Sequence, residues 1–444
     1  MLTREENELL CRVGPDAPMG KMLRRYWIPA LLSRDLEAGG DPKRVRLLGE
    51  DLVAFRGDDG RVGLLDELCP HRRASLVLGR NENNALECLY HGWRVDCTGK
   101  ILDTPVEPED STFKDRIRAT AYTVYEAGGV IWAYMGPPGL EPPPLDLLFT
   151  QVPQSHVHTI RVQTGENWAQ GLEGVIDSSH TNLLHQHGVR PSAEVTTTIQ
   201  QAGFARRPSN DTRPRMESQD TPYGFRYAAI RKPLVDPETQ KYVRVSLFIA
   251  PIYAMFPPPK GWVWLQGFAP IDDTHTMFYF FQVSDTAISD DERAHILETS
   301  RMRPGIDLDD EHRLKGNREN NWLQDRAAMR RGESHTGIYG VNREDIAVQE
   351  SMGAILDRSK EHLGVSDTAV IRFRRMMLDS VKRFIEEGAT PVGLGVPVPY
   401  ADLRAEEQML PLDAAWQTVS AAGVEPVLVS SRAGRGTATI VVAE

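Results

Sequence analysis

The first residues that could do chemistry are two cysteines and two histidines in the first quarter of the chain. Cys69 and His71 are spaced C-x-H, and Cys88 and His91 are spaced C-x-x-H. Thiolates and imidazoles are ligands both of zinc and of iron–sulfur clusters. A structural zinc site usually takes two cysteines from one knuckle, whereas each segment here supplies one Cys and one His. The pattern therefore favours a centre with two inequivalent irons, with a zinc knuckle or unliganded buried side chains as the alternatives.

A second group of possible metal ligands lies in the middle of the chain, at Asp177, His180 and His185. The surrounding sequence predicts a helix, on which Asp177 and His180 would share a face because they are three residues apart. His180 and His185 are five apart, so a regular helix would point them about 140° away from each other. If both bind one metal, the helix is distorted or ends between them. The alternative is a pair of ordinary surface or capping histidines.

Two histidines and one carboxylate are the ligand set that leaves open positions on iron for oxygen chemistry. The carboxylate must come from far along the chain, and Asp345 is the candidate. If Asn342 caps a helix here, Asp345 lies in its first turn. Glu344 and Glu350 compete for the same role, and Asp345 could instead complete a capping box with Asn342.

These residues lie in chain regions of different character. Residues 1–40 are predicted to be a helical segment, and short β-rich runs separated by Gly and Asp turns predict a small antiparallel β domain over 41–145. The Pro-rich stretch 136–146 is the expected boundary. Residues 146–390 mix both patterns, which predicts a large α+β domain, and residues 391–444 are treated as a C-terminal extension.

Within the larger domain the patterns predict strands and helices of ordinary length. The strands are expected within 156–163, 242–256 and 262–284. The helices are expected within 166–185, 289–302, 317–330, 343–363 and 366–387.

Cations are concentrated between residues 205 and 244 of a chain that is acidic overall. Arginine forks bind carboxylates in a bidentate manner, so the region is a candidate site for an acidic ligand. Alternation in the strand predicted here places Tyr242 and Arg244 on one face and Val243 on the other. Taken singly, most of these cations are expected to be solvated or paired with Asp or Glu. They are Arg206, Arg207, Arg213, Arg215, Arg226, Arg231, Lys232 and Arg244.

The composition argues against several classes of protein. The 444 residues include 51 Lys and Arg against 62 Asp and Glu, and the net charge of -11 argues against a general nucleic-acid binder. No apolar run is as long as a membrane helix, and the charged N-terminus lacks the apolar core of a signal peptide, so a cytoplasmic protein is expected. Four cysteines do not make a disulfide scaffold in so long a chain. Cys11 and Cys97 fall outside the metal pattern.

The segments CPHRRASL and CLYHGWRVD resemble the cluster motif of the Rieske non-haem iron aromatic-ring oxygenases. The segments MGKMLRRYW, STFKDRI, TPYGFRYAAIRKP and DIAVQESMG resemble the phthalate 4,5-dioxygenase-like subgroup, and the resemblance extends to about residue 388. It implies an α+β chain, with an N-terminal antiparallel β Rieske domain and a catalytic domain built on a helix-grip-like antiparallel sheet.

The resemblance also implies roles for individual residues. Asp177 would connect His91 of a neighbouring subunit to His180, in a homotrimer or a stacked hexamer. Asn167 matches a polar residue near the iron, and the remaining matches are metal ligands and a carboxylate clamp. The [2Fe–2S] ligands are implied to be Cys69, His71, Cys88 and His91, the ligands of the mononuclear iron His180, His185 and Asp345, and the clamp Arg207 and Arg244.

The implied activity is that of an oxygenase component. Electrons from NAD(P)H would arrive through a separate flavin/iron–sulfur reductase, and O2 would be used to dihydroxylate an aromatic carboxylate related to phthalate. An O-demethylase of a methoxylated, lignin-derived aromatic acid is the first alternative, because the same iron chemistry serves both. A Rieske electron carrier or a zinc-binding module without enzyme activity is the second.

Overall fold

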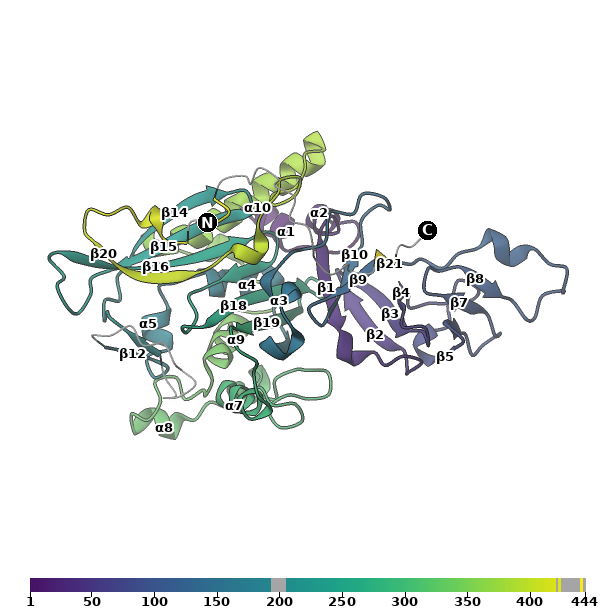
Figure 1. Ribbon diagram of the computed structural model, residues 1–444, viewed down its shortest axis with the longest axis horizontal. Helices are drawn as coiled ribbons and strands as arrows, with labels where there is room; N and C mark the ends of the chain where they lie inside the picture. Colours follow the sequence, from purple (N-terminus) through teal and green to yellow (C-terminus); the bar gives the residue numbers. More distant parts are fainter. Residues whose placement is uncertain (193–204, 421, 425–439, 442–444) are drawn as a thin grey trace. The chain divides into compact units, whose positions relative to one another are not determined.

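The computed structural model describes residues 1–192, 205–420, 422–424 and 440–441 (Figure 1). The chain forms two compact units. The larger unit combines Met1–Arg12 with Asp146–Ser430, and the smaller combines Val13–Leu145 with Ser431–Glu444. Each unit has its own sheets, so each is described separately.

The N-terminal segment is not the single helical region predicted for residues 1–40. Helix α1 (Arg4–Cys11) begins with a capping box between Thr3 and Glu6, and helix α2 (Pro18–Leu23) begins with a proline. The next residues form strand β1 (Trp27–Leu32), which pairs with β10 (Val130–Tyr134). The prediction fails there because a short buried strand and a buried helix share the same apolar pattern, and pairing with a partner strand decides between them.

The smaller unit consists of three antiparallel sheets. One has the order β1-β10-β9-β21, the second β2-β3-β4 and the third β5-β6-β7-β8. Short strands joined by turns are what the Gly- and Asp-rich sequence of this region predicts. The remaining strands are β2 (Lys43–Leu47), β3 (Glu50–Arg56), β4 (Val62–Asp66), β5 (Arg80–Glu82), β6 (Ala85–Glu87), β7 (Arg94–Asp96), β8 (Ile101–Asp103), β9 (Thr123–Ala127) and β21 (Ile440–Val441).

The larger unit is built on an antiparallel sheet of eight strands in the order β11-β19-β18-β17-β16-β15-β14, with β20 also paired to β16. The predicted strands are confirmed, and each of the two long predicted runs is divided by a turn. The strands are β11 (Val157–Thr164), β14 (Arg215–Thr221), β15 (Gly224–Arg231), β16 (Gln240–Ile249), β17 (Tyr253–Met255), β18 (Trp262–Pro270), β19 (Thr276–Ser284) and β20 (Glu406–Pro411). A separate parallel pair joins β12 (Val189–Pro191) to β13 (Ala205–Arg207).

Helices cover this sheet and hold the N-terminal helix. Helix α10 (Thr368–Glu387) crosses the sheet, and its Phe373 packs against Trp168 of α4 (Trp168–Ile176) and Phe248 of β16 (Figure 1). Arg358 binds Glu173 of α4 and also reaches the Cys11 sulfur of α1. The other helices are α3 (Leu148–Gln151), α5 (Thr181–Leu184), α7 (Asp290–Ser300), α8 (Arg326–Arg330) and α9 (Val341–Ser351).

The prediction of an α+β fold with an antiparallel catalytic sheet is confirmed. The helix predicted over 343–363 is shorter, because α9 ends at Ser351. Strand β20, from the predicted C-terminal extension, pairs with β16 and is an integral part of the sheet. Within the described residues, no helix combines the length and apolarity needed to cross a bilayer.

Candidate metal centres and active site

Two turns of the smaller unit carry the Cys and His pairs, and their main chains are bonded alike. The Cys69 amide donates to the Ala74 carbonyl at 2.8 Å, and the Cys88 amide donates to the Trp93 carbonyl at 2.8 Å. In both turns the cysteine is therefore bonded to the residue five positions later. The shared pattern presents two cysteines from equivalent backbone positions.

The fourth residue after each cysteine closes its turn. Arg73 and Gly92 donate their amides to the carbonyls of Cys69 and Cys88, each at 2.9 Å. Both have a left-handed backbone, with φ of 59° and 68°. Gly92 adopts this conformation without steric cost, whereas Arg73 adopts it with a side chain.

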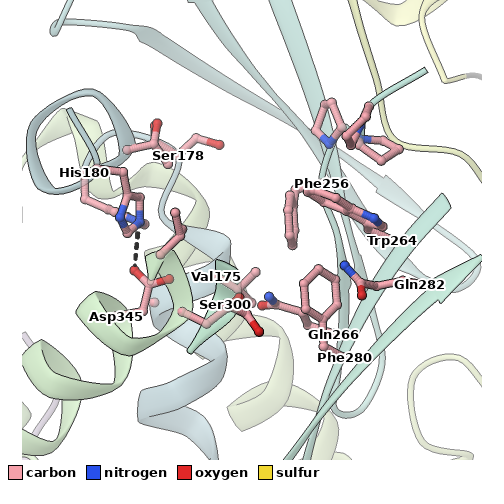
Figure 2. Close-up of a pocket in the computed structure, with 18 of the residues that line it drawn as sticks. Val175, Ser178, His180, Phe256, Trp264, Gln266, Phe280, Gln282, Ser300 and Asp345 are labelled. Carbon is pink, nitrogen blue, oxygen red and sulfur yellow. Dashed lines mark hydrogen bonds and ion pairs between the residues drawn. The ribbon is translucent and has the colours of Figure 1, made fainter. Parts of the chain in front are cut away.

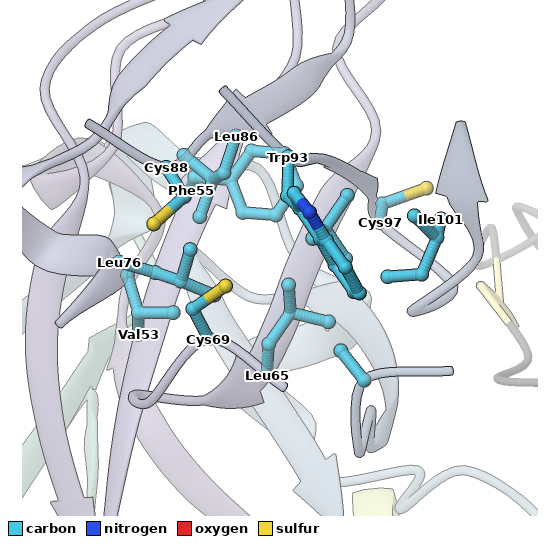
Figure 3. Close-up of a cluster of buried hydrophobic side chains, with 12 residues drawn as sticks. Val53, Phe55, Leu65, Cys69, Leu76, Leu86, Cys88, Trp93, Cys97 and Ile101 are labelled. Atoms are coloured by element: carbon cyan, nitrogen blue, oxygen red, sulfur yellow. The ribbon is translucent and has the colours of Figure 1, made fainter. Parts of the chain in front are cut away.

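The four side chains gather at one end of the unit's apolar core. Cys69 and Cys88 are buried in the core cluster, and Figure 3 shows both sulfurs on one side of Trp93, with Cys97 on the other. The His71 and His91 rings have centroids 4.5 Å apart, and His71 stacks on Trp93. Burial, with the neighbouring Cys88 sulfur, raises the pKa of Cys69.

This donor set fits an iron–sulfur cluster. Two thiols and two imidazoles converge, and the buried Nδ1 of His71 has no hydrogen-bond partner among the described residues. A buried nitrogen left without a partner is costly unless a ligand satisfies it. Two sulfur and two nitrogen donors are the set that a Rieske centre requires.

The second group lies where a helix breaks in the larger unit. Helix α4 ends at Ile176 with Asp177 as its C-cap, and the short helix α5 begins after its N-cap His180. The expectation that the helix ends before His185 is confirmed, but Asp177 and His180 do not share a helical face. A turn brings them together instead, because Asp177 accepts the Ser179 amide at 2.7 Å and lies 3.3 Å from His180 Nδ1.

The three predicted ligands of the mononuclear iron converge on one point. Asp345 Oδ1 lies 3.4 Å from His180 Nε2 and 3.0 Å from His185 Nε2. The two Nε2 atoms are 3.3 Å apart, and the ligand atoms all lie within 4.8 Å of one another. Two imidazoles and a carboxylate at this spacing can hold one cation.

Helix α9 supplies the carboxylate, although it does not begin where predicted. Its N-cap is Gly340 rather than Asn342, so the capping box proposed between Asn342 and Asp345 is not formed. The competing Glu350 points elsewhere, since it accepts from the Gly165 amide at 2.8 Å and the Trp322 indole at 2.7 Å.

Each imidazole is oriented by a second carboxylate. Glu344 Oε2 lies 2.7 Å from His185 Nδ1, and its other oxygen accepts from the Thr336 hydroxyl at 2.6 Å. Asp177 takes the same position beside His180. A carboxylate on Nδ1 turns Nε2 toward the metal and raises the basicity of the ligand. Sequence reasoning treated Glu344 only as a competitor of Asp345 and missed this role.

The charges of the site suit a cation. Burial acts to lower the pKa of His180, but hydrogen bonds to Asp177 and Asp345 outweigh burial and raise it to about 9. Burial acts to raise the pKa of Asp345, yet the His185 and His180 rings hold it below its usual range. A bound metal ion would replace the protons that the imidazoles otherwise carry.

These three side chains lie in the wall of a deep pocket. Figure 2 shows His180 and Asp345 on one side of the pocket and Phe256, Trp264 and Phe280 facing them; Trp264 and Phe280 lie on β18 and β19, and Phe256 directly follows β17. An aromatic ring could lie between the metal and these side chains. Gln266 and Gln282 also line the pocket, as do Arg206, Arg207 and Glu407.

The predicted clamp residues occupy different positions. Arg207 lines the pocket and donates to the Thr181 hydroxyl at 2.7 Å and the Asn182 amide oxygen at 3.0 Å. Burial and the neighbouring Arg244 lower the pKa of Arg207 to about 9. Arg244 is buried on the predicted face of β16, but it does not line the pocket directly. Glu407, which does, lies 3.9 Å from Arg244.

The predicted role of Asn167 near the iron stays a prediction, and the structure gives this residue a position as a helix cap outside the pocket wall. Asn167 is fully buried as the N-cap of α4, where its side-chain oxygen accepts the Ala169 amide. Its amide group donates to the carbonyls of Cys11 at 2.9 Å and Asp273 at 2.8 Å. Both hydrogens of the side-chain amide are therefore donated to main-chain carbonyls, and Asn167 does not line the pocket. Asn is a preferred residue at an N-cap, which is the signal that was overlooked.

Both halves of the chain match known protein families. Residues 26–119 match the family described as Rieske [2Fe-2S] domain, and residues 133–432 match the family described as LigXa C-terminal domain like. The chain belongs to the Rieske non-haem iron oxygenases. A [2Fe–2S] cluster and a mononuclear iron are therefore its cofactors, and it is an enzyme. Family membership excludes the alternatives of an electron carrier and a zinc module.

Individual relatives are similar over most of their length. The chain is 44% identical to the phthalate 4,5-dioxygenase oxygenase subunit of Pseudomonas putida, over 95% of this chain and 95% of that protein. It is 30% identical to the 5,5'-dehydrodivanillate O-demethylase oxygenase subunit of Sphingobium sp., over 88% of this chain and 83% of that protein. The solved structure of an NdmA mutant of Pseudomonas putida CBB5 with theobromine has the same fold, with a TM-score of 0.56 and 18% identity over 85% of this chain and 96% of that one.

Proposed function

We propose that this oxygenase dihydroxylates an aromatic carboxylate related to phthalate. One observation supports this above the others: the cluster of His180, His185 and Asp345 lines a pocket that also contains aromatic side chains and the buried Arg207. The 44% identity to a phthalate 4,5-dioxygenase oxygenase subunit supports the same substrate class.

Each group of residues in the site has its own role in the proposed reaction. A bound iron supplies the activation of O2 at its open positions. Asp177 and Glu344 orient the two imidazoles, and the aromatic walls exclude water and hold the ring. Arg207 binds a carboxylate, which fixes the edge of the ring that faces the metal. The metal ligands are Cys69, His71, Cys88 and His91 for the cluster and His180, His185 and Asp345 for the iron.

Electrons must come from another protein. The most similar relatives described above are named oxygenase subunits, which supports a separate electron-transfer partner, and we propose a flavin/iron–sulfur reductase that uses NAD(P)H. We further propose a homotrimer or stacked hexamer in which His91 of one chain passes electrons through Asp177 of the next to His180. A cytoplasmic location is part of the same proposal.

The second candidate is O-demethylation of a methoxylated aromatic acid. The identity to a dehydrodivanillate O-demethylase subunit favours it, although that identity is lower. Both reactions need an acidic aromatic ligand, so Arg207 serves either one.

The test is a turnover screen of the purified protein with a reductase, using phthalates and methoxylated benzoates under labelled O2. A product that keeps the whole substrate and gains two labelled oxygens supports dihydroxylation. Loss of one carbon as formaldehyde supports demethylation instead. If no aromatic acid is converted while the cluster is reduced normally, the proposed substrate class is wrong.

A further inference from the structure

A carboxylate of the protein itself lies in the wall of the substrate pocket. Glu407 belongs to β20 and pairs directly across the sheet with Arg244 of β16. It lines the pocket, its side chain is only 9% exposed, and it lies 3.9 Å from Arg244 Nε. The Tyr242 hydroxyl donates a hydrogen bond to it. A buried carboxylate is an unusual lining for a pocket that we propose binds acids, and it therefore needs an explanation.

Three guanidinium groups are buried close to one another, and Arg244 among them lies beside this carboxylate. Arg207, Arg231 and Arg244 are 7%, 2% and 5% exposed. Among the described residues, Glu407 is the one carboxylate within 4.0 Å of any of the three. Each group carries a full charge near neutral pH. Asp177 and Asp211 offset part of the charge of Arg231, and Glu407 offsets part of the charge of Arg244 and Arg207, which leaves positive charge in excess. Burying such an excess is costly unless a ligand of opposite charge compensates it.

Two of these arginines have unused donors. Arg231 donates one N–H to the Ser178 carbonyl at 2.7 Å, but its Nε and Nη1 are buried without a hydrogen-bond partner in the described part of the chain. Arg244 Nε is in the same condition, because 3.9 Å to Glu407 is too long for a hydrogen bond. Buried charged donors without partners indicate that a ligand, or water in its absence, completes their bonding.

We propose that Glu407 determines the charge of the aromatic acid that the pocket accepts. The inference rests on the proposed function and extends it to a residue outside the metal site and the arginine clamp. By offsetting the charge of Arg244 and Arg207, Glu407 sets how much positive charge is left for the carboxylates of a ligand. It also repels every anion that enters, and this repulsion grows with the charge of the ligand.

The direct test changes the charge of Glu407 and keeps its shape. Glu407→Gln retains an acceptor for the Tyr242 hydroxyl and removes the negative charge. Binding to the iron-loaded protein is measured by calorimetry for benzene-1,2-dicarboxylate, its monomethyl ester and its dimethyl ester, which carry two, one and no negative charges. Because the interaction scales with ligand charge, the affinity should rise roughly tenfold for the diacid and roughly threefold for the monoester, with no change for the diester.

Glu406→Gln is the matched control. Glu406 is the preceding residue on β20, is exposed, and accepts the Ser420 amide at 3.0 Å. The same change of charge there should leave all three affinities unaltered. The visible spectrum of the cluster and the melting temperature show whether Glu407→Gln is folded, and Glu407→Met, which also removes the charge at a similar size, provides a second variant if it is not.

The outcomes separate the two proposals. If the wild-type protein binds the diacid and Glu407→Gln changes all three affinities equally, or weakens the diacid most, the inference about Glu407 is wrong and the substrate proposal stands. If the wild-type protein binds none of the three ligands and converts no aromatic acid, the proposed function itself is wrong.

Discussion

The two candidate metal centres are assembled in opposite ways. The cluster centre takes its four proposed ligands from two short turns with the same backbone bonding, at Cys69 and at Cys88. The iron centre takes two proposed ligands from a broken helix and the third from α9, so that His185 and Asp345 come together although they are far apart in the sequence. A site built from turns depends on local spacing, whereas a site built between helices depends on the packing of the whole unit.

The surroundings of the imidazoles also differ. His71 and His91 are partly exposed, and no described carboxylate lies within ion-pair distance of either ring. His180 and His185 each have a carboxylate beside Nδ1. Partial exposure suits ligands that exchange electrons with another protein, and carboxylate partners suit ligands whose orientation must be held during turnover.

Asp345→Ala is expected to have the largest effect, because it should destroy the iron centre and leave the cluster centre unchanged. It removes the carboxylate that meets both Nε2 atoms in the described part of the chain, so iron binding and oxygenation should fall to background. The visible spectrum of the cluster should stay unchanged, and iron analysis with product detection measures both effects. Glu350→Gln, five residues further along α9, is the control and should keep most activity. If Asp345→Ala still turns over, the carboxylate ligand is a different residue.

Cys88→Ser is expected to have the opposite effect, damaging the cluster centre and leaving the iron centre intact. Loss of one thiolate should abolish the visible absorption of the cluster and the transfer of electrons from the reductase. The iron site should still bind ferrous ion, which metal analysis and calorimetry can check. Cys97→Ser is the matched control, because Cys97 is buried in the same core on the other side of Trp93. Loss of the spectrum in the control would mean that core packing, and not ligation, explains the result.

Arg207→Gln should leave both metal centres intact and weaken the substrate. Losing a charge-assisted bidentate contact should raise KM for an aromatic acid by about a hundredfold, with a smaller change in kcat. Steady-state kinetics with the acid and with its neutral ester provide the measurement. The exposed Arg213 is the control, and Arg213→Gln should behave as the wild-type protein. An equal loss for acid and ester would show that Arg207 supports the pocket structurally.

Glu344→Gln should weaken the iron centre without destroying it. Removing the charge beside His185 Nδ1 lowers the basicity of the imidazole, and changes of this kind typically cost about 10- to 100-fold in metal affinity. Ferrous ion titration measures it, with the cluster spectrum as an internal control. Glu344→Asp, which keeps the charge but shortens the side chain, should recover part of the affinity. Unchanged iron retention in Glu344→Gln would contradict the orienting role.

From the sequence, the four side chains that gather at the candidate cluster centre can be chosen as a set, whereas the surroundings of the candidate iron centre can be predicted only in part. Cys69, His71, Cys88 and His91 are recognisable because their spacing is itself the structure of the two turns. The sequence predicts Asp345 as the carboxylate beside the histidines, but it does not predict that Glu344 bonds to His185 Nδ1. Adjacent residues on a helix point about 100° apart, and the local pattern does not show which of them faces the histidines.

Local sequence patterns do not predict the position of Glu407 in the pocket, and the reason is different from that for Glu344. Its position in the pocket exists because β20 pairs with β16, and Glu407 lies opposite Arg244 only in that register. The surrounding stretch has few motifs, so nothing near Glu407 in the sequence indicates a partner so far away. Pairing register between distant strands is set by the burial of both faces, which a single sequence does not reveal.

The smallest effect on catalysis is expected at Asn167, which belongs to neither centre. As the N-cap of α4 it holds the helix that leads to Asp177, so Asn167→Ala should lower the free energy of unfolding by about 1–2 kcal/mol. Denaturant titration measures that loss, and kcat per folded protein should change by less than about twofold. Asn167→Ser restores the capping oxygen but not the donors to Cys11 and Asp273, so its stability should lie between the two. A large fall in kcat at unchanged stability would instead return Asn167 to the active site, because a residue that only caps a helix acts through folding.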